Sequence, residues 1–132
     1  MNKLDKENII AIAALLIHAA NIDEIYSDKE KDLIKNFINS YLKDEDANVI
    51  LKKAEEIENN SNHLLKYTNI IKENSNEIKK DIMEHLWKII ISDNTVDQYE
   101  SNLMRRICGL IYFSDKLSGE IKMSLTLERK KI

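Results

Sequence analysis

The sequence contains no proline, only two glycines and a single cysteine among its 132 residues. Leu, Ile, Lys, Glu and Asn are abundant instead, and nothing in this composition favours strands. The lone Cys108 cannot form an internal disulfide, so the sequence gives no indication of an oxidising compartment. We therefore expect an all-α protein in the cytoplasm, with Cys108 as a buried thiol of its core.

The sequence also has no strong excess of positive or negative charge: its formal net charge is only −3. A domain that binds nucleic acid is expected to be basic, so the sequence argues against this class of partner. The sequence further lacks a glycine-rich phosphate loop, a serine or cysteine nucleophile motif and a His-acid constellation. We therefore expect neither nucleic-acid binding nor catalytic activity.

The one long hydrophobic run is IIAIAALLIHAA at residues 9–20. It is far shorter than the roughly 20 apolar residues that a membrane-spanning helix needs. Asp5 and Glu7 precede it and dilute the positive charge that a signal peptide carries at this point. Because the run is apolar nearly all round, it predicts a central buried helix and no transmembrane segment.

Apolar residues recur at helical spacing along the rest of the chain, and residues that favour helix N-caps separate these segments. The length suits one domain with one core. We predict about seven helices: the first at about residues 4–21, and the others after Ser27, after Asp44, around 64–71, after Asn74 or Ser75, after Asp97 and after Ser114.

Two parts of the chain fall into register when the sequence is shifted by 70 positions. The matched acidic and capping residues are Asp23 with Asp93, Glu30 with Glu100, Ser27 with Asp97, and Asp44 with Ser114. The segment at 64–71 has no counterpart. The pattern predicts two pseudo-symmetric three-helix halves, joined by a short connector helix and packed together through the first and fifth helices.

Ser27 with Glu30, and Asp97 with Glu100, have the spacing of a capping box. In this motif the cap side chain and the glutamate each accept a hydrogen bond from the other residue's backbone N–H. Acidic residues in a first turn also stabilise the positive end of the helix dipole. Capping therefore accounts for both glutamates, but it does not require the aspartates that lie four residues before the caps.

The second acidic turn and the helix after it carry a recognisable motif, formed by Asp93, Asn94, Val96, Asp97, Tyr99, Glu100, Leu103, Arg105 and Arg106. The first copy is similar at Asp23, Tyr26, Ser27 and Glu30. Together these residues resemble the tellurite-resistance TerB-like family, over roughly residues 7–128. The family's turn glycine is replaced by Glu24 in one copy and by Asn94 in the other. Asn adopts the left-handed conformation more readily than Glu, so we expect the first turn to differ in shape.

The resemblance implies a single TerB-like helical domain over residues 1–132, with a duplicated all-α fold. It also implies a link to tellurite or related stress responses. The partner that it implies is a protein, for which a membrane-associated complex is one expectation. It further implies that acidic residues bind metal. Carried onto this sequence, the metal-binding positions are Asp23, Glu30, Asp93, Asp97 and Glu100.

Two interpretations of these acidic residues stay open. In the first, their carboxylates bind a hard divalent cation such as calcium or magnesium, which prefers oxygen ligands and offsets the repulsion among clustered charges. In the second, they act only as helix caps, and the chain is an adaptor that binds a protein partner in a groove between its halves. The sequence does not define the oligomeric state.

Overall fold

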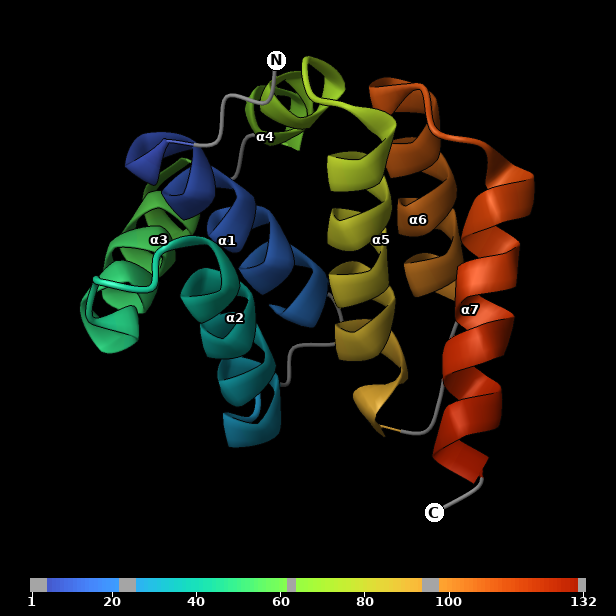
Figure 1. Ribbon diagram of the computed structural model, residues 1–132, viewed down its shortest axis with the longest axis horizontal. Coiled ribbons are helices and arrows are strands. Elements are labelled where there is room, and N and C mark those ends of the chain that lie inside the picture. The colour runs from blue at the N-terminus through green and yellow to red at the C-terminus, as the bar shows by residue number, and fades with distance from the viewer. Residues whose placement is uncertain (1–4, 22–25, 62–63, 94–97, 131–132) are drawn as a thin grey trace.

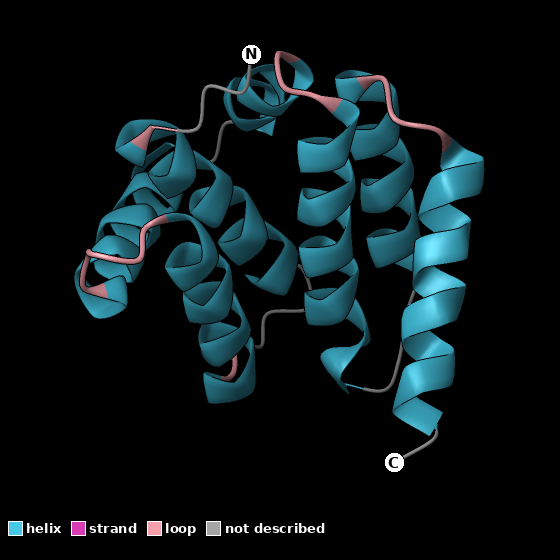
Figure 2. Ribbon diagram, viewed as in Figure 1, coloured by secondary structure: helices cyan, strands magenta, loops and turns pink. Residues whose placement is uncertain are grey.

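The computed structural model describes residues 5–21, 26–61, 64–93 and 98–130. These residues form α1 (Lys6–Ala20), α2 (Asp28–Tyr41), α3 (Ala47–Ser61), α4 (Leu64–Lys72), α5 (Asn76–Ile90), the short 3-10 helix η2 (Ile91–Asp93), α6 (Gln98–Ile111) and α7 (Asp115–Lys130). Figure 1 shows their arrangement, and Figure 2 shows helices and loops but no strand in the described ranges. The all-α fold with seven α-helices, predicted from the sequence, is confirmed.

Helix α1 lies at the centre of the first part of the molecule and is covered on every side. Residues 9–20 are all buried except His18, which is partly exposed. Helices α2, α3, α4 and α5 pack around it. The Asp5 carboxylate caps its first turn by accepting a hydrogen bond from the Asn8 backbone N–H at 2.8 Å. In the described part of the chain, no helix is both long enough and apolar enough to cross a membrane.

Helix α5 is the centre of the second part and packs against α1, α2, α4 and α7 (Figure 1). Its contact with α1 agrees with the predicted packing of the first helix on the fifth. Trp87 of α5 is 4% exposed, and its Nε1–H donates a hydrogen bond to the Ser118 hydroxyl of α7 at 2.9 Å. Cys108 of α6 is buried as predicted, and burial raises the pKa of its thiol.

Most helices begin where the sequence predicted. Ser27 and Ser75 cap α2 and α5, and the Ser114 hydroxyl accepts a hydrogen bond from the Leu117 backbone N–H at 3.3 Å at the start of α7. The predicted start of α3 at Asp44 is wrong. The Glu45 backbone N–H closes a turn on the Leu42 carbonyl, so α3 begins only after Asp46.

The later start of α3 has a simple physical cause. Asp44 and Asp46 are both residues that favour helix caps, and the sequence alone does not choose between them. In the structure the Asp46 carboxylate accepts a hydrogen bond from the Asn48 backbone N–H at 2.9 Å, which makes Asp46 the residue that satisfies the first turn. The match of caps between Asp44 and Ser114 is therefore displaced by two residues, and the internal repeat stays a prediction.

A buried carboxylate joins three helices of the first part. Glu58 of α3 is 8% exposed, and its Oε2 lies 2.8 Å from His18 Nδ1 of α1. Its Oε1 accepts a hydrogen bond from the Tyr67 hydroxyl of α4 at 3.1 Å, and Tyr67 is fully buried. Both oxygens of the buried carboxylate thus have partners, which offsets the cost of removing the group from water.

We predict that Tyr67→Phe lowers the free energy of unfolding by about 1–3 kcal/mol, because it leaves a buried carboxylate oxygen without its donor. Tyr112→Phe is the matched control, since Tyr112 is 75% exposed, and it should change stability by less than about 0.5 kcal/mol. Urea unfolding of the parent and the two variants measures both effects. Equal stability of the two variants would contradict a structural role for the Tyr67 hydroxyl.

Candidate functional site

The helix ends that flank the two acidic turns predicted from the sequence lie at the same edge of the molecule. Helix α2 begins at this edge, and α5 ends there and continues into η2 (Figure 1). The Lys29 ammonium in the first turn of α2 donates a hydrogen bond to the Ser92 carbonyl of η2 at 3.1 Å, across 63 residues of sequence. The start of α2 and the end of α5 are therefore close enough for the Lys29 side chain to reach from one to the other.

The first of these turns contains a complete capping box. The Glu30 backbone N–H donates to the Ser27 hydroxyl oxygen at 3.2 Å, while the Ser27 backbone N–H donates to Glu30 Oε1 at 2.8 Å. The Ser27 hydroxyl also donates to Glu30 Oε1, at 3.0 Å. Glu30 is only 6% exposed, so its carboxylate is held against the helix end rather than extended into solvent.

An aromatic residue borders the same turn. Tyr26 precedes the cap, and the Lys31 ammonium lies 5.0 Å from the centre of its ring. Its hydroxyl is buried and makes no hydrogen bond of good geometry within the described residues. Burial raises the pKa of this phenol well above its usual range, and the neighbouring carboxylates of Glu55 and Glu30 raise it further. The hydroxyl is therefore neutral at physiological pH and does not act as an anionic ligand.

The five predicted metal-binding residues are described to different extents. Glu30 is committed to the capping box. The backbone of Asp93 ends η2, and that of Glu100 lies in the first turn of α6, but their side chains are outside the described structure. Asp23 and Asp97 lie outside the described residues altogether. Within the described part, no group of three or more His, Cys, Asp or Glu side chains is arranged to hold a metal ion.

Lys29 introduces a positive charge where the sequence pattern alone suggested only acids. Its ammonium reaches the Ser92 carbonyl, immediately before Asp93 in the sequence, so it lies between the start of α2 and the end of α5. A lysine in this position can offset the repulsion between carboxylates that a bound cation would otherwise offset. The sequence carries no signal for this role, because a lysine in the first turn of a charged helix is ordinarily a solvent-exposed residue.

A second site lies on the described surface, in a groove of about 580 Å³ between α5 and α7. Its floor is formed by the apolar residues Leu117, Ile121 and Leu125 of α7. Its walls carry Lys80, Glu84 and Lys88 on α5, and Glu120, Ser124 and Glu128 on α7. This groove lies within the second half of the chain, whereas the groove between the halves stays a prediction.

Helix α7 is the least covered of the helices around the groove. It lies at the edge of the molecule and packs on α5 and α6 only, among the closer contacts of the described elements (Figure 1). Leu117 is 47%, Leu127 is 53% and Met123 is 66% exposed. Exposed large apolar side chains that gather on one element indicate an interaction surface more than isolated ones do.

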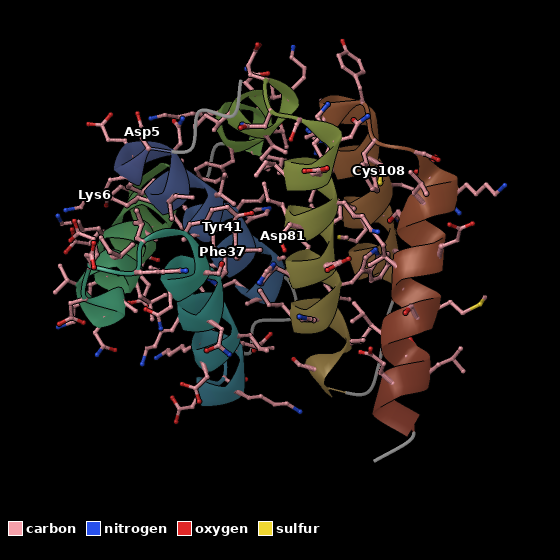
Figure 3. The ribbon with its side chains drawn as sticks, viewed as in Figure 1. Asp5, Lys6, Phe37, Tyr41, Asp81 and Cys108 are labelled. Carbon is pink, nitrogen blue, oxygen red and sulfur yellow. The ribbon has the colours of Figure 1, made fainter. Side chains whose placement is uncertain are left out.

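A third group of polar residues lies between α2 and α5. The Tyr41 hydroxyl of α2 donates a hydrogen bond to the Asp81 carboxylate of α5, and Figure 3 shows both beside Phe37. The His85 ring packs edge-on against Phe37 at 5.1 Å between ring centres, and its Nδ1 lies 2.8 Å from the Asp81 carbonyl. Burial and then the Asp81 carboxylate raise the pKa of the Tyr41 phenol. These contacts fix α2 on α5.

The fold and these surfaces define a helical domain with the start of α2 and the end of α5 at one edge and an open groove beside α7. The family model of tellurite resistance protein TerB matches residues 9–123. Because the match covers most of the chain, the protein belongs to this family, and the resemblance seen in its motifs is confirmed. The comparisons with curated proteins and with solved structures gave no match.

The capping box gives a direct test of the role of Glu30. Glu30→Gln keeps an oxygen that accepts from the Ser27 backbone, so we expect it to cost less than about 1 kcal/mol, mainly through the helix dipole. Glu30→Ala leaves that donor unsatisfied and should cost roughly 1–3 kcal/mol. Thermal or urea unfolding measures the difference, with Glu56→Ala on the exposed face of α3 as control. Equal losses for the Gln and Ala variants would show that capping is not what Glu30 contributes.

Proposed function

We propose that the chain is a non-enzymatic protein-binding module that acts in tellurite or a related stress response. Family membership supplies the biological context, and the groove between α5 and α7 is the observation that carries the proposal. An apolar floor between charged walls is the arrangement that protein interfaces use, with a hydrophobic centre and a polar rim. Leu127 of α7, which is 53% exposed and does not line the groove, adds a further exposed apolar side chain on the same helix.

Several features support binding rather than catalysis. The described polar clusters are engaged in contacts between helices, as at Glu58 and Asp81, and are not arranged around a cavity. The two phenols with raised pKa values are harder to deprotonate than free tyrosine, which is the opposite of what a general base requires. The groove is lined by Lys, Glu and Leu or Ile side chains and by Ser124, whose hydroxyl makes no hydrogen bond to a basic side chain among the described residues.

Photo-crosslinking tests the proposed interface. A photoreactive amino acid at Ser124, which is exposed in the α7 wall of the groove, should form a covalent adduct with a protein in the cells that make the chain. The same amino acid at Lys52, which is exposed on α3, is the matched control. Adducts from position 124 and not from position 52 are the expected result, with the adduct's mass separating a second copy from another protein. The same adduct pattern from both positions would contradict the proposal.

A divalent cation at the acidic turns is a second candidate function. The Lys29–Ser92 contact supports it in one respect, because the start of α2 and the end of α5, which flank the two acidic turns in the sequence, lie close together. The ligands would come from Asp23, Glu30, Asp93, Asp97 and Glu100, and calcium or magnesium suits such oxygen donors. This candidate is compatible with protein binding, because the groove and the acidic turns involve different residues.

The cation candidate predicts that calcium or magnesium raises the melting temperature of the chelator-treated parent, since a ligand of the folded state stabilises it by mass action. Glu100→Gln, which preserves the capping geometry, and Asp93→Asn, which lies outside the box, should both abolish this increase. Glu56→Gln on exposed α3 should keep it. Differential scanning calorimetry with and without each ion provides the measurement. If neither calcium nor magnesium changes the melting temperature of the parent protein, this candidate is eliminated.

A further inference from the structure

The two walls of the α5/α7 groove carry complementary charge patterns at the same spacing. On α5, Lys80, Glu84 and Lys88 follow one another at intervals of four residues, and on α7 Glu120, Ser124 and Glu128 do the same. Residues eight apart on a helix are separated by about 12 Å along its axis. Each wall therefore presents two charges of one sign at its ends, with lysines on α5 and glutamates on α7.

These charges have no partners within the described part of the chain. None of the four end residues, Lys80, Lys88, Glu120 and Glu128, takes part in an ion pair there. All four are exposed, and the groove holds the two walls apart. A complementary surface that inserts opposite charges would therefore gain contacts that the single chain does not make.

We propose that the occupant of the groove is a second copy of this chain, so that two α5/α7 layers stack face to face. Helices α5 and α7 run in the same direction (Figure 1). A twofold axis parallel to both helices then lays α5 of each copy over α7 of the other, also in the same direction. This inference rests on the proposed protein-binding function of the groove and names its partner.

The charge pattern favours this arrangement. Lys80 and Lys88 of one copy face Glu120 and Glu128 of the other, because both pairs have the same eight-residue spacing and line the same groove. Glu84, the acid between the two lysines, faces the neutral Ser124. A twofold contact is self-complementary, so each pairing occurs twice and four ion pairs form. The opposite twofold, perpendicular to the helices, would set α5 on α5 and bring lysines together.

The apolar residues of the groove supply the centre of the interface. Leu117, Ile121 and Leu125 from each copy meet beneath the charged rim, in the four-helix arrangement that such stripes form in bundles. The 47% exposure of Leu117 in the single chain is removed by this contact. Because exposed ion pairs rim a small apolar centre, the dimer is of modest affinity and weakens as salt screens the charges.

Charge reversal on the exposed walls tests the dimer without disturbing the core. The variants are K80E/K88E, E120K/E128K and the fourfold exchange, each studied by sedimentation equilibrium beside the parent. Each double variant should weaken self-association by roughly tenfold or more, because four attractions become repulsions. An equimolar mixture of the two double variants should associate as a heterodimer, and the fourfold exchange should dimerise by itself. The variant K52E/K53E, which makes the same charge change on exposed α3, should behave as the parent.

The outcomes separate this inference from the function on which it rests. A parent that remains monomeric at millimolar concentration overturns the second-copy proposal. So does a dimer that is unaffected by both double reversals and by L117S, since such a dimer forms on another surface. In either case, crosslinking from position 124 to a different protein would leave the protein-binding function in place. The proposed stack is supported if each double variant alone associates weakly and the equimolar mixture of the two forms a heterodimer.

Discussion

The burial of residues 9–20 of α1, all but His18, is the constraint on which the rest of the structure depends. Residues 9–20 are apolar nearly all round, so the helix has no face that water can cover without cost. Each buried large aliphatic side chain contributes about 1.5–3 kcal/mol relative to exposure. Four helices must therefore surround α1, and α2, α3, α4 and α5 do so. The short α4, which has no counterpart in the second part of the sequence, is needed for this cover.

Apolar packing alone would allow these covering helices to shift along one another, and hydrogen bonds to two carboxylates, one buried and one partly exposed, restrict their positions. Glu58 accepts from Tyr67 and contacts His18, while Asp81 accepts from Tyr41. The Glu58 carboxylate requires partners at hydrogen-bond distance, because a carboxylate removed from water is costly without them. The first group sets α3 and α4 relative to α1, and the second sets α2 relative to α5. Directional polar contacts thus specify an arrangement that a non-directional hydrophobic effect leaves open.

Local patterns in the sequence were sufficient for the helices and most of their caps. Ser27 and Glu30 form the predicted capping box because both partners lie within one turn and need no tertiary contact. The start of α3 was misplaced because neighbouring aspartates offer equivalent caps, and a turn closed by the backbone selected between them. Contacts across 40 residues, such as His18 with Glu58, carry no periodic signal and could not be foreseen. The acidic site was ambiguous for a related reason, since capping and cation binding both require acids in a first turn.

The two central helices differ in how completely the chain covers them, and this difference locates the interaction surface. Helix α1 is enclosed by its neighbours, whereas α5 keeps a charged strip of Lys80, Glu84 and Lys88 beside α7. An exposed strip of Lys and Glu is ordinarily satisfied by water, so it does not by itself require cover. The apolar floor next to it does, because Leu117 and Leu125 remain partly in solvent after folding. Covering that floor places a surface against both charged walls, and a surface that matches them presents glutamates to α5 and lysines to α7. The chain's own α5/α7 face meets this requirement when it is turned about an axis parallel to the two helices.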